Sequence, residues 1–360
     1  MSDMEDKNKT TGNRYVFIDY TRVLAIFCVV LCHTVVVVYS RDTDALGALS
    51  NQANFFRICV FTLGRSFGVP FFLMISGFLL LDKFYDTSKI RRFYINNWGH
   101  IIACTVIWFA LYYIYAFIIL NSEASLTGLL KEMLLLKQPT LSHQWYLPMI
   151  IGYYAMLPFV ANALYNSDSL RALFIPYLMV FVYGSLVLSA NMLLDLLGKE
   201  SLSPQIEMGF TGGVYGLYII TGFLIKKGML KRIKTTIILF IAAVSISMQV
   251  VFVFRYYSTD YIVWYDSPLV IIASIAVFEL TARTEKMKAN RFVTFLARNA
   301  FAVYLLHMMI RDIPFIRQSL SGLNKASQTL ILTVIIMVVS YALAWLMGKT
   351  KIGRYMLYIK

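Results

Sequence analysis

The chain has 360 residues, of which 59% are hydrophobic and 14% charged, and its formal net charge is +14 at pH 7. Soluble domains carry about 25% charged residues, so this composition excludes an ordinary soluble globular protein. Apolar runs of about 20 residues, the length of a helix that crosses a hydrocarbon core, recur along the sequence. These runs are continuous rather than alternating with polar residues, which argues against a transmembrane barrel. The composition predicts an all-α polytopic membrane protein.

We predict about ten transmembrane helices joined by mostly short loops. The first span is not a cleavable signal peptide, because its apolar run is too long and no small-residue cleavage site follows it. We expect a short N-terminal tail over 1–15, a single transmembrane domain over 16–348 and a short basic tail over 349–360. The predicted spans, in chain order, are 16–39, 60–81, 98–120, 145–165, 172–194, 210–225, 235–255, 266–282, 292–311 and 328–348.

The lysines and arginines are distributed unequally between the two sides of such a bundle. Of the 33, 22 fall in one alternating set of loops and tails, 10 fall in the opposite set, and Arg22 lies inside the first span. Cytoplasmic loops carry the excess of Lys and Arg, so this bias predicts that both termini are cytoplasmic. It also explains most of the net charge without a nucleic-acid partner.

The first span begins with the stretch DYTRVLAIFCVVLCHTVVVVYS, which carries Asp19, Arg22 and His33. On an α-helix the last two lie on one face, about 20° and about 16 Å apart. Asp19 lies on the same face and within ion-pair reach of Arg22. One interpretation is structural, with an interfacial ion pair and one interhelical hydrogen bond from His33. The other is a substrate channel, in which Arg22 holds an anion entering from the cytoplasm and His33 performs proton chemistry.

The loop after the second span, DKFYDTSKIRRFYINNW, contains the basic residues Lys89, Arg91 and Arg92. The ordinary explanation is the cytoplasmic charge bias, but Arg and Lys beside a polar channel also suit a phosphate-bearing ligand. The second span itself contains Ser76 and Gly77, which permit either close helix packing or a local opening.

Two further polar sites lie along the predicted membrane domain. In SHQWYLPM, His143, Trp145 and Tyr146 stand where an outer loop enters the fourth span, and the two aromatic residues also suit an interfacial aromatic belt. His307 lies deep in the ninth span, within NAFAVYLLHMMIRD. The four cysteines show no spacing typical of a zinc site or a disulfide framework, and we predict no metal site.

Taken together, these motifs resemble acyltransferase family 3, whose integral-membrane members acylate glycans and related acceptors of bacterial envelopes. The family's first span opens with an acid and an Arg, followed by ten residues and a His, as in this chain. Three further family motifs are matched, so that the resemblance covers essentially the whole chain. The matching residues are Phe71, Phe72, Ser76, Gly77 and Phe78 in the first motif, Trp145 to Leu147 with Tyr154 and Pro158 in the second, and Tyr304 to His307 in the third.

The resemblance implies a bilayer-embedded enzyme that uses cytoplasmic acyl-CoA, most simply acetyl-CoA, as donor substrate and has no permanently bound cofactor. Arg22 and the basic loop residues Lys89, Arg91 and Arg92 would hold the donor's phosphates. His33, with Asp19 as second catalytic residue, would act as general base or carry the acyl group transiently. The acceptor, a saccharide or lipid-linked saccharide, would approach from the outer side near Trp145 and Tyr146. The residues expected to line either the acceptor site or the channel are Ser76, Gly77, His143, Trp145, Tyr146 and His307. The location would be a bacterial inner membrane.

The basic loop departs from many relatives, which have two arginines three residues apart followed by a proline-bearing helix start. Some relatives carry a further esterase-like domain, and we expect a single-domain enzyme here. Two other classes stay open from the sequence. A multi-span transporter or flippase for a polar or anionic substrate would use the same line of charges, although we find no convincing inverted repeat. A non-catalytic subunit of a polysaccharide export machine is the third.

Overall fold

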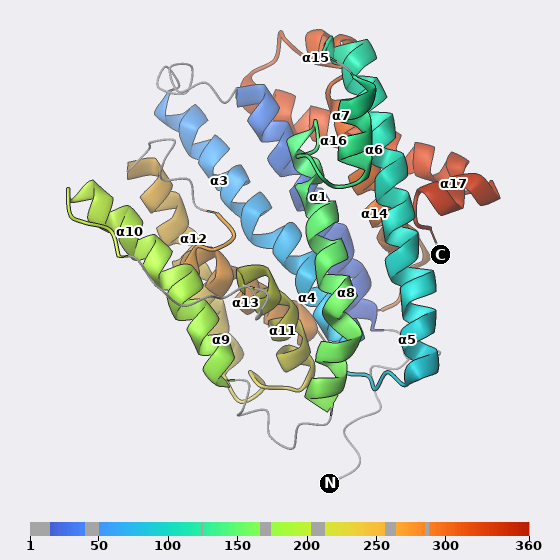
Figure 1. Ribbon diagram of the computed structural model, residues 1–360. Helices are drawn as coiled ribbons and strands as arrows, with labels where there is room; N and C mark the ends of the chain where they lie inside the picture. Colours follow the sequence, from blue (N-terminus) through green and yellow to red (C-terminus); the bar gives the residue numbers. More distant parts are fainter. Residues whose placement is uncertain are drawn as a thin grey trace.

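The computed structural model describes residues 15–39, 50–123, 125–165, 174–202, 213–255, 264–284 and 288–359, and within these ranges every regular element is a helix (Figure 1). The main helices form one bundle, and several short helices cover its ends. In chain order the elements are α1 (Val16–Tyr39), α3 (Asn51–Phe67), α4 (Val69–Leu80), α5 (Thr87–Phe93), η1 (Tyr94–Trp98), α6 (Gly99–Leu120), α7 (Leu126–Met133), η2 (Ser142–Trp145), α8 (Tyr146–Tyr165), α9 (Phe174–Phe181), η4 (Val182–Leu186), α10 (Val187–Leu196), α11 (Gly213–Lys226), α12 (Thr235–Arg255), α13 (Pro268–Ala282), α14 (Arg291–Arg311), α15 (Pro314–Ser319), α16 (Lys325–Met347) and α17 (Lys351–Met356).

The prediction of an all-α polytopic membrane protein is confirmed. Among the described residues, eight helical stretches are long and apolar enough to cross a membrane, and α11 and α13 are shorter apolar helices. Hydrocarbon offers no hydrogen-bond partners, so a spanning segment must satisfy its backbone groups internally, as a helix does. Each of the ten predicted spans corresponds to one of these helical stretches.

The second and third stretches begin earlier than predicted. The second runs over Asn51–Leu80, because the polar start of α3 continues through Gly68 into α4. The third runs over Thr87–Leu120, because the basic loop forms α5, which continues through the π-helical turn η1 into α6. Both extensions are too polar to appear in a hydropathy pattern, although they propagate the same helices.

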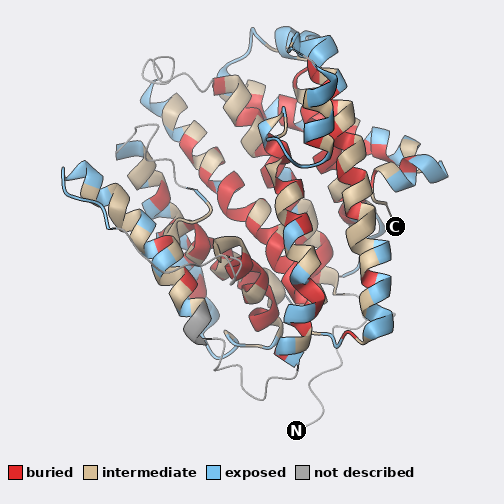
Figure 2. Ribbon diagram, in the orientation of Figure 1, coloured by how far each residue is buried: buried red, intermediate tan, exposed pale blue. Residues whose placement is uncertain are grey.

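Helix α1 lies inside the bundle and packs against α3, α4, α13, α14 and α16. Figure 2 shows buried residues concentrated on these inner helices, whereas the outer helices and the helix ends are more exposed. Near the start of α1, the Thr21 hydroxyl donates a hydrogen bond to the Thr281 hydroxyl of α13 at 3.3 Å. The neighbouring Tyr20 hydroxyl donates to the Lys288 carbonyl at 3.1 Å. We call this end of the molecule, with the start of α1 and helix α5, the basic end; the opposite end, where α1 finishes and α3 begins, is the distal end.

A clamp of unlike charges closes the basic end between α4 and α11. Asp82, just after α4, pairs with Lys226 at 3.3 Å and with Lys227 at 2.5 Å. Burial raises the pKa of the Asp82 carboxyl, but the hydrogen bond from Lys227 and the two cationic charges outweigh this and hold the pKa below its usual value. The carboxylate therefore stays ionised and holds the two helix ends together.

Two glycines bring α4 and α11 into backbone contact. A Cβ atom added to Gly77 would lie 1.7 Å from the Ile219 carbonyl oxygen, and one added to Gly222 would lie 1.9 Å from the Met74 carbonyl oxygen. Neither contact can be relieved by a side-chain rotation, because backbone atoms block both. Small residues commonly permit this kind of close approach between membrane helices.

The C-terminal segment, expected as a basic tail, folds against α6. The Met356 carbonyl accepts hydrogen bonds from the Trp108 indole at 2.8 Å and from the Cys104 thiol at 2.9 Å. His100 stacks on Tyr355 with ring centroids 4.4 Å apart. His100, which no sequence motif explained, thus holds helix α17.

We predict that Gly77→Ala or Gly222→Ala destabilises the protein by about 1–3 kcal/mol or more, because the added methyl group forces α4 and α11 apart. Thermal unfolding of the detergent-purified protein measures this. Gly152→Ala is the matched control, since a Cβ at this exposed helical position meets nothing within 4 Å. Equal stability of Gly77→Ala and Gly152→Ala would contradict the close packing.

Candidate active site

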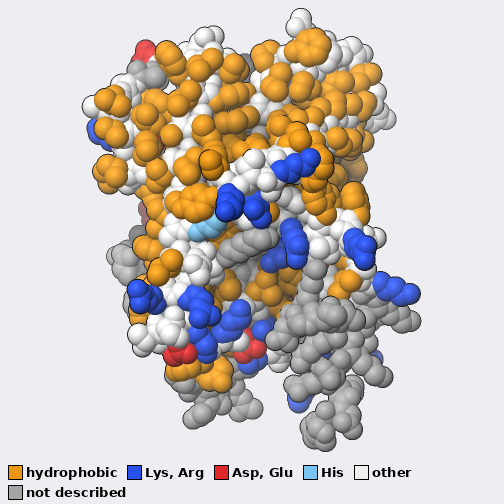
Figure 3. All heavy atoms as spheres, turned by 90° about the vertical axis from the view of Figure 1, so that its right-hand side faces the viewer, with side chains coloured by type: hydrophobic (Ala, Val, Ile, Leu, Met, Phe, Trp, Pro, Cys, Tyr) orange, Lys and Arg blue, Asp and Glu red, His pale blue; other side chains and the backbone are white. Residues whose placement is uncertain are grey.

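The polar line on α1 begins at the basic end. The Arg22 guanidinium lies 3.9 Å from the Asp19 carboxylate, which is buried and also accepts a hydrogen bond from Thr294 of α14 at 3.4 Å. Figure 3 shows Lys and Arg side chains gathered in the lower half of one face, below a surface of hydrophobic side chains. Arg22 is therefore a cation positioned at an already cationic end of the bundle.

The distal half of the same helix contributes to a cluster of three imidazoles. The ring centroid of His33 lies 5.3 Å from that of His307 on α14 and 6.2 Å from that of His143 on η2. The third distance, between His143 and His307, is 5.5 Å. His143 and His307 are fully inside the protein. Three of the four histidines of the chain, far apart in sequence, thus meet at one point, which we call the histidine cluster.

The hydrogen bonds of the cluster leave two buried ring nitrogens open. His307 Nδ1 lies 2.6 Å from the Tyr304 carbonyl oxygen, which only accepts, so this nitrogen carries the hydrogen in the neutral ring. His307 Nε2 then carries a lone pair and has no hydrogen-bond partner, and His143 Nδ1 has none either. Buried polar atoms are normally satisfied, and exceptions often mark sites of catalysis or ligand binding.

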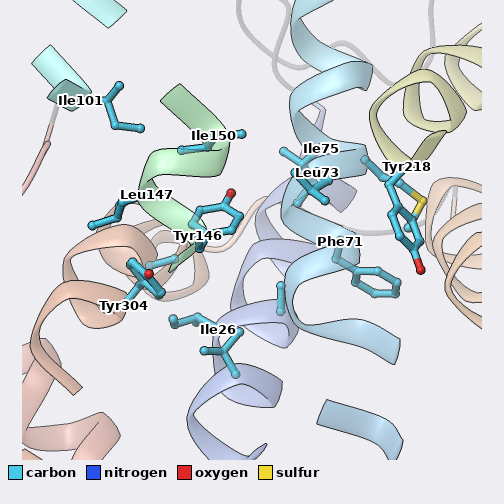
Figure 4. Close-up of a cluster of buried hydrophobic side chains, with 14 of the residues drawn as sticks. Ile26, Phe71, Leu73, Ile75, Ile101, Tyr146, Leu147, Ile150, Tyr218 and Tyr304 are labelled. Carbon is cyan, nitrogen blue, oxygen red and sulfur yellow. The ribbon is translucent and has the colours of Figure 1, made fainter. Parts of the chain in front are cut away.

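Tyrosines surround the cluster and fix its backbone. The Tyr304 hydroxyl donates to the His143 carbonyl at 2.9 Å, and the Tyr112 hydroxyl donates to the Leu305 carbonyl at 2.7 Å. The Tyr112 ring lies against the His143 ring at 4.9 Å between centroids. Figure 4 shows Tyr146 of α8 beside Tyr304 of α14, and their centroids are 5.6 Å apart. The Tyr304 and Tyr112 hydroxyls thus hold the backbone of His143 and of Leu305, two residues before His307, and in this way help to position the histidines.

The cluster does not have the geometry of a metal centre. Within the described part of the chain, no group of three or more His, Cys, Asp or Glu side chains is arranged to hold a metal ion. None of the four cysteines, all of which lie in the described ranges, forms a disulfide.

The structure does not bring all predicted site residues together. Asp19 lies fourteen residues, about 21 Å along α1, from His33, and its described contacts are with Arg22 and Thr294. Asp19 therefore positions Arg22 rather than His33, and a catalytic role for it stays a prediction. Gly77 forms the helix contact described above.

Ser76 faces the bundle interior between α4 and α8. Its hydroxyl lies 3.1 Å from the Tyr154 hydroxyl and bonds to the Phe72 carbonyl at 3.0 Å. Trp145 belongs to an aromatic group, with ring centroids 5.4 Å from Tyr215 and 5.7 Å from Tyr265. Both positions border the interior and are compatible with the predicted channel.

The basic residues of the loop lie on helix α5, at the basic end. Asp86 caps this helix and accepts hydrogen bonds from Ser88 at 2.7 Å and from the Lys89 backbone at 2.9 Å, which lower the pKa of the Asp86 carboxyl. Lys89 pairs with the same carboxylate at 3.3 Å. Arg91 and Arg92 are exposed. The two arginines are thus available at the protein surface, whereas Lys89 is engaged in capping.

Sequence reasoning missed Tyr112 and Arg65 as contributors to the interior, and it used Tyr304 only as part of the family motif. Tyr304 precedes His307 by three residues, the spacing that puts both on one helix face, so its role was readable from the pattern. Tyr112 is one of several aromatic residues in its span, and nothing local distinguishes it. Arg65 is an ionisable residue inside an apolar stretch, a signal that the count of loop charges concealed.

A bundle of apolar helices that encloses three histidines and carries basic side chains at one end defines a membrane protein with an interior polar site. The chain belongs to acyltransferase family 3, since the family's acyltransferase-domain model matches residues 15–349. The protein is thus a membrane acyltransferase, and the suspected resemblance is confirmed. None of the curated proteins or solved structures compared with the chain matches it.

We predict that Tyr304→Phe lowers both stability and acyl transfer, because it leaves the buried His143 carbonyl without its donor at a cost of about 1–3 kcal/mol. Tyr341→Phe is the matched control, since its hydroxyl donates to the Leu296 carbonyl at 3.2 Å, away from the cluster. Thermal unfolding should register both changes, whereas acyl transfer should fall only for Tyr304→Phe. An equal loss of activity in the two variants would remove the positioning role of Tyr304.

Proposed function

We propose that this membrane acyltransferase moves an acyl group, most simply acetyl, from cytoplasmic acyl-CoA to a hydroxyl of an envelope or exported saccharide, or of its lipid-linked precursor, in a bacterial inner membrane. The observation that carries the proposal is the histidine cluster in the bundle interior, whose His33 lies on the same face of α1 as Arg22. Family membership supports acyl transfer. Acyl-CoA as donor and a saccharide hydroxyl as acceptor are supported by the chemistry of these residues and by what members of the family act on.

The spacing along α1 suits a CoA thioester. Arg22 and His33 are eleven residues apart, which corresponds to about 16 Å along the helix. The pantetheine arm has about as many chain atoms as four to five residues, and a peptide of that size extends over about 13–18 Å. With its phosphates at Arg22 and at the arginines of α5, the donor would present its thioester to the cluster.

The transfer step needs one proton acceptor and one proton donor. The acceptor's hydroxyl oxygen attacks the thioester carbonyl, the carbon–sulfur bond breaks, and the hydroxyl proton passes to an imidazole. The same imidazolium then protonates the leaving thiolate, so that CoA departs as the thiol. Imidazole suits both halves of this cycle because it exchanges protons near neutral pH. His33 is our candidate for this residue, with a transient acyl-imidazole as the alternative route.

The other two histidines extend this chemistry. The open Nε2 of His307 and the open Nδ1 of His143 offer two further sites for a proton or a hydrogen-bonded hydroxyl within the cluster. Each would orient the attacking hydroxyl or share the proton with His33. The bond from His307 Nδ1 to the Tyr304 carbonyl fixes which nitrogen of His307 is open.

We predict that acetyl-CoA raises the thermal stability of the detergent-purified protein and that Arg22→Ala removes the effect. A ligand at one hundred times its dissociation constant stabilises a protein by about 2.7 kcal/mol. Arg57→Ala, at the distal end of α3, is the matched control and should respond as the wild type does.

A folded wild-type protein that shows no shift with acetyl-CoA would overturn the proposed donor. That outcome would make transport of a polar substrate the better account of the charges on α1. A shift that survives in Arg22→Ala would keep the donor and reject Arg22 as its ligand.

We predict that His33→Ala lowers acyl transfer by about 100-fold to 10,000-fold, the usual contribution of a general base, while leaving the protein folded. His307→Asn should also lower transfer, because the amide can still donate to the Tyr304 carbonyl but lacks the second ring nitrogen. His100→Ala is the control, since His100 stacks on Tyr355 outside the cluster. Transfer of labelled acetyl from acetyl-CoA in membranes of the native host measures all three. Full activity in His33→Ala would reject its assigned role.

A further inference from the structure

A second buried polar group packs against α1 at Cys32, the residue before His33. Arg65 of α3 is buried, with 9% of its surface exposed, at the depth of Cys32, whose side chain accepts one of its hydrogen bonds. The neighbouring glycine of α3, Gly64, packs directly on Cys32, which brings the two helices together at this point. Arg65 is therefore held next to the residue that precedes His33.

The guanidinium is stacked between aromatic rings. Its central carbon lies 3.6 Å from the ring centroid of Trp264, 4.5 Å from that of Phe61 and 5.5 Å from that of Tyr265. Such stacking stabilises the cation through its faces and leaves the N–H donors at its edges free to bind.

The charge of Arg65 is not neutralised within the described part of the chain. No carboxylate there lies within ion-pair distance of it, and its Nη1 atom is buried without a hydrogen-bond partner. Asp266 interacts electrostatically with the Arg65 guanidinium, but it lies beyond ion-pair distance. A buried charge is costly unless it is paired and hydrogen-bonded. An anion that binds at the open edge would supply both.

An aromatic wall runs from Arg65 to the histidine cluster. Tyr265 lies 6.3 Å from Tyr215 of α11 between ring centroids, and Trp145 of η2 lies within 5.7 Å of both. Trp145 follows His143 by two residues. At the other end, Trp264 is 40% exposed, so the wall reaches the protein surface. The wall thus runs from the protein surface to Trp145, two residues along the chain from His143 of the histidine cluster.

The side from which this wall opens points to the acceptor rather than the donor. Trp264 and Tyr265 lie four and three residues before the start of α13, whose other end contacts Thr21 at the basic end. They therefore lie away from the basic end. Cys32 is ten residues, about 15 Å along α1, from Arg22, where the donor's phosphates are proposed to bind.

We propose that Arg65 and this aromatic wall form a binding subsite for an acidic sugar unit of the acceptor, an inference that rests on the proposed function. The sugar ring stacks on the aromatic side chains, and its carboxylate or phosphate accepts hydrogen bonds from the open edge of Arg65. The attacking hydroxyl, on the same or the next unit, then reaches the histidine cluster. Planar guanidinium groups bind such anions by paired, charge-assisted hydrogen bonds.

The test is ligand-dependent thermal stabilisation of the full-length protein in detergent, with Trp fluorescence as a second readout. The probes are methyl glucuronide, glucose 1-phosphate, methyl glucoside and inorganic phosphate. We expect at least one acidic sugar to stabilise the wild type and the neutral methyl glucoside to do so less. The carboxylate and phosphate probes distinguish an acidic residue from a sugar phosphate.

In Arg65→Gln we expect the half-maximal concentration of the acidic sugar to rise about tenfold or more, the loss of a charge-assisted hydrogen bond. Arg57→Gln, on the same helix, is the matched control and should behave as the wild type. Equal stabilisation by the acidic and neutral sugars, or by inorganic phosphate without a sugar, would overturn the proposal. So would an unchanged response in Arg65→Gln.

The comparison of probes on the wild type needs no variant, so a poorly folding Arg65→Gln leaves the proposal falsifiable. Acetyl-CoA is added to the same samples as an independent arm. A wild type that responds to acetyl-CoA but not to acidic sugars rejects this subsite and keeps the proposed donor. A wild type that responds to acidic sugars but not to acetyl-CoA keeps the subsite and rejects the donor.

Discussion

The absence of water in a hydrocarbon core is the constraint on which this structure depends. A polar group placed there must find its partners inside the protein, so the bundle keeps its buried polar side chains on inward faces among buried apolar ones, and many large apolar side chains lie on its outer surface. Most of them are satisfied locally. Thr34 and Thr105, for example, bond back to carbonyls of their own helices. Against this background, the open nitrogens of His143 and His307 and the open edge of Arg65 are exceptions that require a functional explanation.

The close packing of the bundle gives these exceptions a fixed geometry. Backbone contact at Gly77 and Gly222 locks α4 to α11, and the tyrosines around the cluster bond to backbone carbonyls rather than to each other. A site built in this way is preorganised, since its polar groups need no rearrangement when charge develops during reaction. The cost is the burial of unpaired donors and acceptors, which the substrates would satisfy.

The sequence predicted the helices well and the site in part. Continuous apolar runs located all ten apolar helices, and the eleven-residue spacing placed Arg22 and His33 on one face of α1. Periodicity describes one helix at a time, however, so it could not show that His33, His143 and His307 converge from three elements. The same limitation hid the difference between Gly77, which packs on a backbone, and Ser76, which faces Tyr154.

Arg65 and the histidine cluster suit two different tasks, binding and reaction, which a single kind of side chain would not serve equally well. Arg65 carries a permanent positive charge and suits a group that must be held, whereas an imidazole changes protonation and suits a group that must react. If both were arginines, nothing could accept the hydroxyl proton; if both were histidines, an acidic ligand would be held only in one protonation state. On the proposed function, the aromatic wall between them lets one bound saccharide occupy both, with its anion at Arg65 and its hydroxyl at the histidine cluster. The identity of the acceptor then depends on the distance between those two groups, because only a sugar whose acid and reactive hydroxyl span it can engage both at once.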